Sequence, residues 1–102
     1  MRIPEELKQI AEHYGYEIQS SQLIEECAEL ILALSKHRRA MGIGQPISDY
    51  HKTAVIDNLV EEIADVEIML EQVKYLLNIP ENDILAIKYF KINRCKERMQ
   101  GE

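Results

Sequence analysis

The stretch "IDNLVEEIADVEIMLEQVKYLL", from Ile56 to Leu77, decides the fold. Its aliphatic residues recur at alternating steps of three and four, which is the seven-residue repeat of a helix that packs against another helix. The repeat consists of Ile56, Leu59, Ile63, Val66, Leu70, Val73 and Leu77. The pattern predicts a long helix that stops where "NIPEND" begins, at Asn78 and Pro80.

The rest of the chain also has helical spacing, and no segment favours a strand. Three further helices are expected, at Pro4–Tyr14, from Glu17–Ser21 to Ala40 with Ser20 or Ser21 as its cap, and from Glu81 or Asn82 to Met99. The only long loop is "MGIGQPISDYHK", Met41–Lys52, with two glycines and a proline. Short turns elsewhere predict antiparallel neighbours, so we expect one all-α domain over residues 1–102, a four- to five-helix antiparallel bundle.

Charge and composition exclude several classes of function. The net charge of −6 argues against sequence-independent binding to DNA or RNA, which needs a basic face. No run approaches the ~18 apolar residues of a membrane span, and the polar N-terminus is not a signal peptide, so we expect a cytoplasmic protein. The only cysteines, Cys27 and Cys95, belong to no Cys/His cluster, which makes a zinc site unlikely, and Cys27 is expected to be a reduced, buried thiol.

Two similar acidic segments of eight residues occur in the chain. "LIEECAEL", Leu23–Leu30, and "LVEEIADV", Leu59–Val66, share four identical positions. At about 100° per residue on a helix, Glu26 and Glu29 lie at the same angle from an aliphatic stripe as Glu62 and Asp65. The stripes are Leu23, Cys27, Leu30 and Leu34 in one helix and Leu59, Ile63, Val66 and Leu70 in the other.

Antiparallel packing along these stripes would bring the four carboxylates to one seam. Four anions in a half-buried site repel one another, which raises their pKa values, and Mg²⁺ relieves the repulsion because it prefers oxygen ligands. An acidic pair beside an apolar stripe is more commonly a solvated face. Ala33 and Met69, one turn further along, favour faces that are covered.

A di-iron carboxylate bundle is the rival metal site. That site needs a Glu-x-x-His pair on two helices. None of His13, His37 and His51 follows a Glu by three residues, so the pattern does not favour iron.

The order Glu25-Glu26-x-x-Glu29, a spacer, then Glu62-x-x-Asp65 resembles the E-E-x-x-E … E-x-x-D signature of the MazG-like, all-α nucleoside triphosphate pyrophosphohydrolases. The resemblance covers about residues 17–98. It implies Mg²⁺-dependent cleavage of a nucleoside triphosphate to the monophosphate and pyrophosphate, with Mn²⁺ as a substitute ion. It further implies that Glu26, Glu29, Glu62 and Asp65 bind the metal and that Glu25 orients or deprotonates the attacking water.

The last predicted helix offers a grip for phosphates. Lys88, Lys91, Arg94 and Arg98 fall within about 120° of its surface. The family often has Lys, Asn and Arg here, and "KINR", Lys91–Arg94, looks similar, which implies that Asn93 contacts a sugar hydroxyl or the base. Cations near a helix C-terminus also complement the helix dipole and stay solvated, and that alternative remains open.

Two other functions remain open from sequence. Phosphoribosyl-ATP pyrophosphatase shares much of the signature, and a non-catalytic helical interaction module would carry its carboxylates as surface decoration. The long loop matches no motif, although Tyr50 and His51 could stack on a base. We also expect a homodimer or homotetramer, because one chain exposes more aliphatic stripe than four short helices cover.

Overall fold

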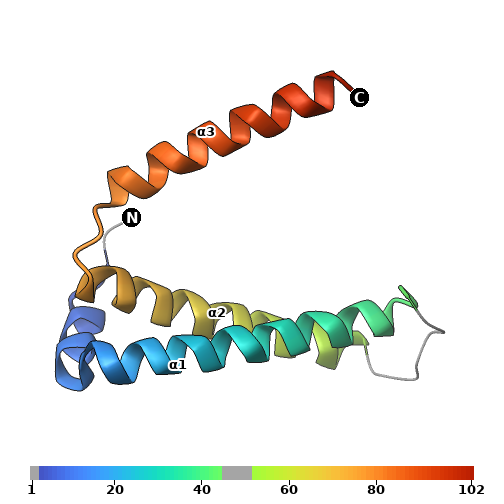
Figure 1. Ribbon diagram of the computed structural model, residues 1–102. Helices are drawn as coiled ribbons and strands as arrows, with labels where there is room; N and C mark the ends of the chain where they lie inside the picture. Colours follow the sequence, from blue (N-terminus) through green and yellow to red (C-terminus); the bar gives the residue numbers. More distant parts are fainter. Residues whose placement is uncertain (1–2, 45–51) are drawn as a thin grey trace.

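The computed structural model describes residues 3–44 and 52–102 and contains three helices. These are α1 (Glu5–Ala40), α2 (Lys52–Leu76) and α3 (Glu81–Gln100), shown in Figure 1. The described residues contain no strand, so the all-α prediction is confirmed. Within the same residues, no helix is both long enough and apolar enough to cross a membrane.

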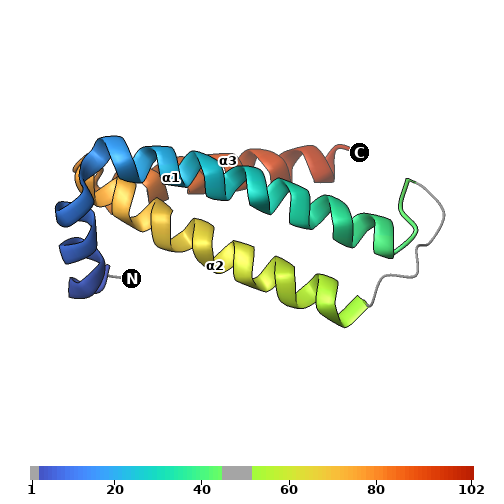
Figure 2. The same cartoon turned by 90° about the horizontal axis from the view of Figure 1, so that it is seen from below.

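The first two predicted helices form the single element α1, with a kink at Gly15. Gly15 has φ 84° and ψ 169°, a backbone conformation that is open almost only to glycine. The chain turns sharply there, and the first segment lies across the end of the long segment (Figures 1 and 2). Ser20 and Ser21 lie inside α1 and cap nothing, and the Ser20 hydroxyl donates to the carbonyl of Glu17. The predicted count of four to five helices is therefore not confirmed.

α1 and α2 run antiparallel as a hairpin, and among the described residues they are the only pair of helices whose backbones pack side by side (Figures 1 and 2). The residues buried along their seam are Gln19, Ala33 and Ala40 from α1 and Val55, Met69, Gln72 and Val73 from α2. The Gln19 Nε2 donates to the Gln72 Oε1 at 2.8 Å across the seam. The small alanines leave room for the helices to approach each other closely.

The aliphatic stripes lie beside this seam rather than in it. Glu26 is seven residues from both Gln19 and Ala33, which places it in the seam, and Leu34 is about 80° around α1 from Glu26. In α2, Leu70 is likewise about 80° around the helix from Glu62. Leu34 and Leu70 are 47% and 43% exposed, so these two members of the stripes are not covered by the facing helix.

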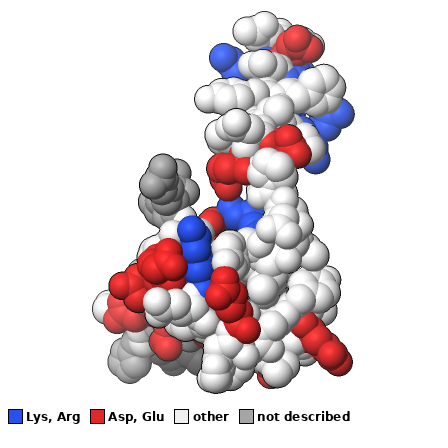
Figure 3. All heavy atoms as spheres, turned by 90° about the vertical axis from the view of Figure 1, so that its left-hand side faces the viewer, with Lys and Arg blue, Asp and Glu red and all other residues white. Residues whose placement is uncertain are grey.

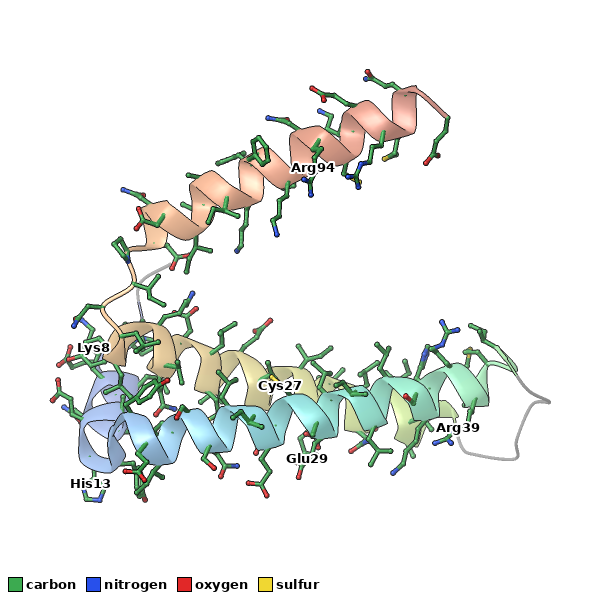
Figure 4. All side chains as sticks on the ribbon, viewed as in Figure 1. Lys8, His13, Cys27, Glu29, Arg39 and Arg94 are labelled. Carbon is green, nitrogen blue, oxygen red and sulfur yellow. The ribbon has the colours of Figure 1, made fainter. Side chains whose placement is uncertain are left out.

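The hairpin consequently has two unlike faces. When two helices pack antiparallel, residues at the same angle around each helix axis, measured from the seam in the direction of the chain, lie on the same side of the pair. The aliphatic face carries Leu23, Cys27, Leu30 and Leu34 together with Leu59, Ile63, Val66 and Leu70. The carboxylate face carries Glu29 and Asp65, each about 60° from the seam in the opposite sense. Figure 4 shows Glu29 on the side of α1 that faces away from α3.

α3 diverges from the hairpin instead of packing on it. α2 ends in a Schellman motif, with Asn78 at φ 55° and the Ile79 amide bonded to the Lys74 carbonyl at 3.1 Å. The Lys74 Nζ then meets the Glu81 Oε2 at 3.2 Å, which ties the start of α3 to the end of α2. No residue of α3 is buried, and Figure 3 shows the helix standing clear of the body. One chain alone is therefore not a closed bundle.

Candidate metal site

Three of the four predicted metal ligands converge in the α1–α2 seam. Glu26 of α1 and Glu62 and Asp65 of α2 each offer one carboxylate oxygen, and these oxygens all lie within 4.8 Å of one another. All three residues are half-buried. The two acidic octets are thus brought together, as their matched angles predict.

The sequence places these carboxylates where a helix pair normally buries apolar side chains. Glu62 is seven residues from both Val55 and Met69, which are buried in the seam. Glu26 has the same relation to Gln19 and Ala33. The burial of Ala33 and Met69 confirms the expectation that the acidic faces are covered one turn further along. The helix packing therefore holds Glu26 and Glu62 partly out of water.

Two of the carboxylate oxygens in the seam are buried without a hydrogen-bond donor. Among the described residues, neither the Glu26 Oε2 nor the Glu62 Oε2 has a partner. The other oxygen of Glu26 accepts a hydrogen bond from the Gln22 Nε2 at 2.7 Å. Burying an anionic oxygen without a donor or a cation costs free energy. A hard cation between Glu26 and Glu62 would compensate that cost.

Glu62 lies in an environment that disfavours its charged form. Desolvation by burial raises the pKa of Glu62 above the ordinary glutamate value, and the neighbouring charges of Glu29, Asp65 and Glu26 raise this pKa further. A hydrogen bond between the carboxyl groups of Glu29 and Glu62 acts in the same direction. Burial and the neighbouring carboxylates thus act in the same direction on the pKa of Glu62.

The remaining acidic candidates lie at the margin of the cluster. Glu29 is exposed and does not belong to the three-residue group, but its carboxyl group contacts that of Glu62. Glu25 is also exposed, and its position is about 100° around α1 from Glu26. The structure thus places Glu29 beside the cluster and leaves Glu25 on the open surface of α1.

The predicted substrate residues are not brought to the carboxylates within one chain. Lys88, Lys91, Asn93 and Arg94 are all exposed on α3, whose backbone packs against neither helix of the hairpin among the described residues. Asn93 is about 160° around α3 from Lys91, so the two side chains project from opposite faces. The Arg94 guanidinium lies 5.8 Å from the Phe90 ring of its own helix. These cations therefore lie apart from Glu26 in the structure.

Sequence reasoning overlooked two polar features of the seam. Gln22, which holds one oxygen of Glu26, could have been found from its position four residues before that carboxylate. The buried Gln19–Gln72 pair carries no such local signal because its partners are far apart in the chain. Tyr50 and His51, the candidates for base stacking, lie outside the described residues.

Comparison with known proteins adds no assignment: no family model, no curated protein and no solved structure matches this chain. Functional inference therefore depends on the carboxylate geometry and on the resemblance of the two octets to the MazG-like signature.

Proposed function

We propose that the protein is an Mg²⁺-dependent nucleoside triphosphate pyrophosphohydrolase that acts as a homodimer or homotetramer. It would cleave a ribo- or deoxyribonucleoside triphosphate to the monophosphate and pyrophosphate and so clear unwanted nucleotides. The observation that carries the proposal is the convergence of Glu26, Glu62 and Asp65 within 4.8 Å. The order of these residues in the chain, which resembles the MazG-like signature, supplies the substrate class.

The donor set fits magnesium. Hard, doubly charged cations with oxygen ligands suit a group made only of carboxylates, whereas zinc prefers nitrogen and sulfur. Glu26, Glu62 and Asp65 would hold the ion, and Glu29 would contribute from beside Glu62. When bound, Mg²⁺ would neutralise phosphate charge and lower the pKa of water. This explains how an acidic protein can accept an anionic substrate.

The chain's own residues would position the reacting groups. The Gln22 amide holds one oxygen of Glu26, which fixes the direction of its carboxylate. Glu25, on the open surface of α1, would accept a proton from the attacking water. Lys88, Lys91 and Arg94 would bind the phosphates through charge-assisted hydrogen bonds, as cations do at phosphoryl-transfer sites.

The test is product analysis over a panel of nucleotides. The protein is incubated with ribo- and deoxyribonucleoside triphosphates and with phosphoribosyl-ATP, in Mg²⁺ or in chelator. We expect monophosphate and pyrophosphate from at least one nucleoside triphosphate, only with Mg²⁺. Glu62→Gln should lower kcat/KM by at least about a hundredfold, while the exposed neighbour Glu61→Gln serves as the matched control.

Each other result of this assay has a definite meaning. Diphosphate and orthophosphate would show that a different bond is cut. Turnover of phosphoribosyl-ATP alone would assign the second activity that the sequence leaves open. No turnover of any substrate, together with a melting temperature that does not respond to Mg²⁺, would favour the interaction module.

A further inference from the structure

The repeat formed by the two acidic octets extends one residue further toward the N-terminus. Gln22 precedes "LIEECAEL" and Asn58 precedes "LVEEIADV", so a residue with a carboxamide side chain stands before each octet. Each amide lies four residues before a carboxylate of the seam, Gln22 before Glu26 and Asn58 before Glu62. Residues four apart are neighbours on a helix surface, so the two amides occupy equivalent places beside the candidate metal site.

The two amides make different contacts. The Gln22 Nε2 donates to one oxygen of Glu26 at 2.7 Å. The Glu62 Oε2 is buried without a donor among the described residues, so Asn58 does not hold this oxygen. Asparagine is one methylene shorter than glutamine, which keeps its amide closer to its own backbone. Asn58 is half-buried, and it therefore brings to the edge of the cluster an amide that does not satisfy the buried oxygen of Glu62.

Two contacts fix the register of the hairpin around the site. The Gln19 Nε2 donates to the Gln72 Oε1, and the carboxyl group of Glu29 meets that of Glu62. The two contacts agree with each other, because the same number of residues separates Glu29 from Gln19 and Gln72 from Glu62. The residues that face each other elsewhere along the antiparallel seam follow from this register.

Asn58 faces an alanine across the seam. Asn58 and Ala33 each lie four residues beyond the Glu29–Glu62 pair, in the direction of the loop. Alanine ends at its Cβ and Ala33 is 1% exposed, so α1 offers the amide no polar side chain at this level. Around α2, Asn58 is about 40° from Glu62 and about 20° from Asp65, on the carboxylate face. Figure 4 shows Glu29, on the same face, directed away from α3, so α3 of the same chain does not cover this side.

Both of the shortened side chains in the repeat belong to α2. Asn58 takes the place of Gln22, and Asp65 takes the place of Glu29, with one methylene less in each case. A cation held by the carboxylates would therefore leave more room beside α2 than beside α1 for an oxygen of a further ligand. An amide N–H suits an anionic oxygen in that space, because hydrogen bonds to charged acceptors are short and strong.

We propose that Asn58 is a substrate-binding residue, whose side-chain amide donates a hydrogen bond to a phosphate oxygen of the metal-bound triphosphate. The inference rests on the proposed function, which supplies both the cation and the triphosphate. Gln22 is instead a positioning residue that acts through Glu26. Asn58 provides its contact from the same hairpin as the carboxylates, whereas the cations of α3 lie apart from them.

Calorimetric titration separates the two roles without turnover. The full chain is titrated with Mn²⁺, and the Mn²⁺-saturated protein is then titrated with the Mn²⁺ complex of inorganic triphosphate, which carries no sugar or base. Asn58→Ala should bind Mn²⁺ as the wild-type protein does and bind triphosphate at least about tenfold more weakly. Gln22→Ala is the matched control with the converse result. It should bind Mn²⁺ about tenfold more weakly, because Glu26 loses the donor that orients it, and bind triphosphate normally once saturated.

The length of the side chain provides a second test. Asn58→Gln restores the missing methylene, so its amide should reach the Glu62 carboxylate as Gln22 reaches Glu26. We expect this variant to melt at a higher temperature than the wild-type protein in chelator, because a buried acceptor gains a donor. It should nevertheless bind the triphosphate complex more weakly than the wild-type protein does. Loss of binding in a protein that has become more stable cannot come from misfolding.

The results that would overturn this inference differ from those that would overturn the proposed function. Normal triphosphate binding by Asn58→Ala, in a protein that binds Mn²⁺ and cleaves nucleotides, would remove Asn58 from the substrate site and retain the function. Mn²⁺ binding weakened by Asn58→Ala as much as by Gln22→Ala would instead make Asn58 a positioning residue for Glu62. No Mn²⁺ binding by the wild-type protein would overturn both.

Discussion

At the scale of single residues, Glu62 of the candidate site has a carboxyl group whose pKa is raised by burial and by its acidic neighbours. Its carboxylate sits in the α1–α2 seam with one buried oxygen that lacks a donor, beside Glu26, Glu29 and Asp65. Such a group is held in place by the packing of the helices rather than by its own interactions. We therefore expect the charged Glu62 carboxylate to lower the stability of the folded protein when no cation is bound.

Neutralising Glu62 should stabilise the metal-free protein. Glu62→Gln removes the repulsion from its three acidic neighbours while keeping a side chain of similar size. We expect the melting temperature in chelator to rise by about a few degrees. Glu61→Gln, on the exposed side of α2, should change it very little. A lower melting temperature for Glu62→Gln than for Glu61→Gln would show that the Glu62 charge is not destabilising.

The same residue predicts a dependence of stability on pH. The pKa of Glu62 is raised in the folded state, so the folded protein holds this proton more tightly than the unfolded chain. The contribution of Glu62 is therefore most favourable below the ordinary glutamate pKa and is lost as the pH rises through the raised value. We expect the stability advantage of Glu62→Gln in chelator to grow as the pH rises over this range.

Mg²⁺ should reverse the pH effect. Since the ion stabilises the charged carboxylates, the increase in melting temperature that it causes should be small at acid pH and larger at neutral pH. Thermal unfolding of the wild-type protein from pH 4 to 8, with Mg²⁺ and with chelator, measures this difference. An increase that is independent of pH would place the ion elsewhere on the protein.

At the scale of elements, the kink of α1 depends on one glycine. Gly15→Ala should destabilise the protein by about 1–3 kcal/mol, because an alanine is strained at φ 84° and ψ 169° even though no atom lies within 4 Å of the added Cβ. Gly101→Ala is the control, since Gly101 has φ −88° and its new Cβ would meet only ordinary contacts. Urea denaturation measures both. Equal effects would show that the backbone at Gly15 carries no strain for alanine.

The hairpin also contains a buried polar pair whose two members depend on each other. Gln19→Leu leaves the Gln72 amide without its partner in the seam, so we expect a loss of about 1–3 kcal/mol in the free energy of unfolding. Adding Gln72→Leu should recover part of this loss, because it removes the unsatisfied group. A double-mutant cycle in urea gives the coupling. Additive losses would mean that the two amides stabilise the hairpin independently.

The elements also show what sequence patterns can establish. The acidic octets have equal spacing from their aliphatic residues, so the helix period alone predicts that Glu26 and Glu62 come together. The pattern does not say which stripe is buried, because Leu34 and Leu70 satisfy an amphipathic helix as well as Ala33 and Met69 do. The aliphatic stripe is the more apolar one, yet the structure leaves it beside the seam. The pattern therefore predicted burial for Leu34 and Leu70, which the structure leaves exposed.

At the scale of the whole molecule, the direction of α3 is the feature that sequence could not provide. Its existence follows from the pattern between Glu81 and Gln100, but its direction follows from the backbone at Asn78 and from the Lys74–Glu81 contact. Local patterns predict helices, whereas the angle between helices depends on a few turn residues and on what each helix packs against.

The metal site itself is tested most directly by titration with Mn²⁺, monitored by electron paramagnetic resonance of the free ion. Wild-type protein and Glu61→Gln should remove Mn²⁺ from solution with the same affinity, and Mg²⁺ should compete for it. Glu62→Gln and Asp65→Asn should each weaken binding by at least about tenfold, because each loses a charged ligand. Equal Mn²⁺ binding by all four proteins, or no binding by any, would contradict a metal site in the α1–α2 seam.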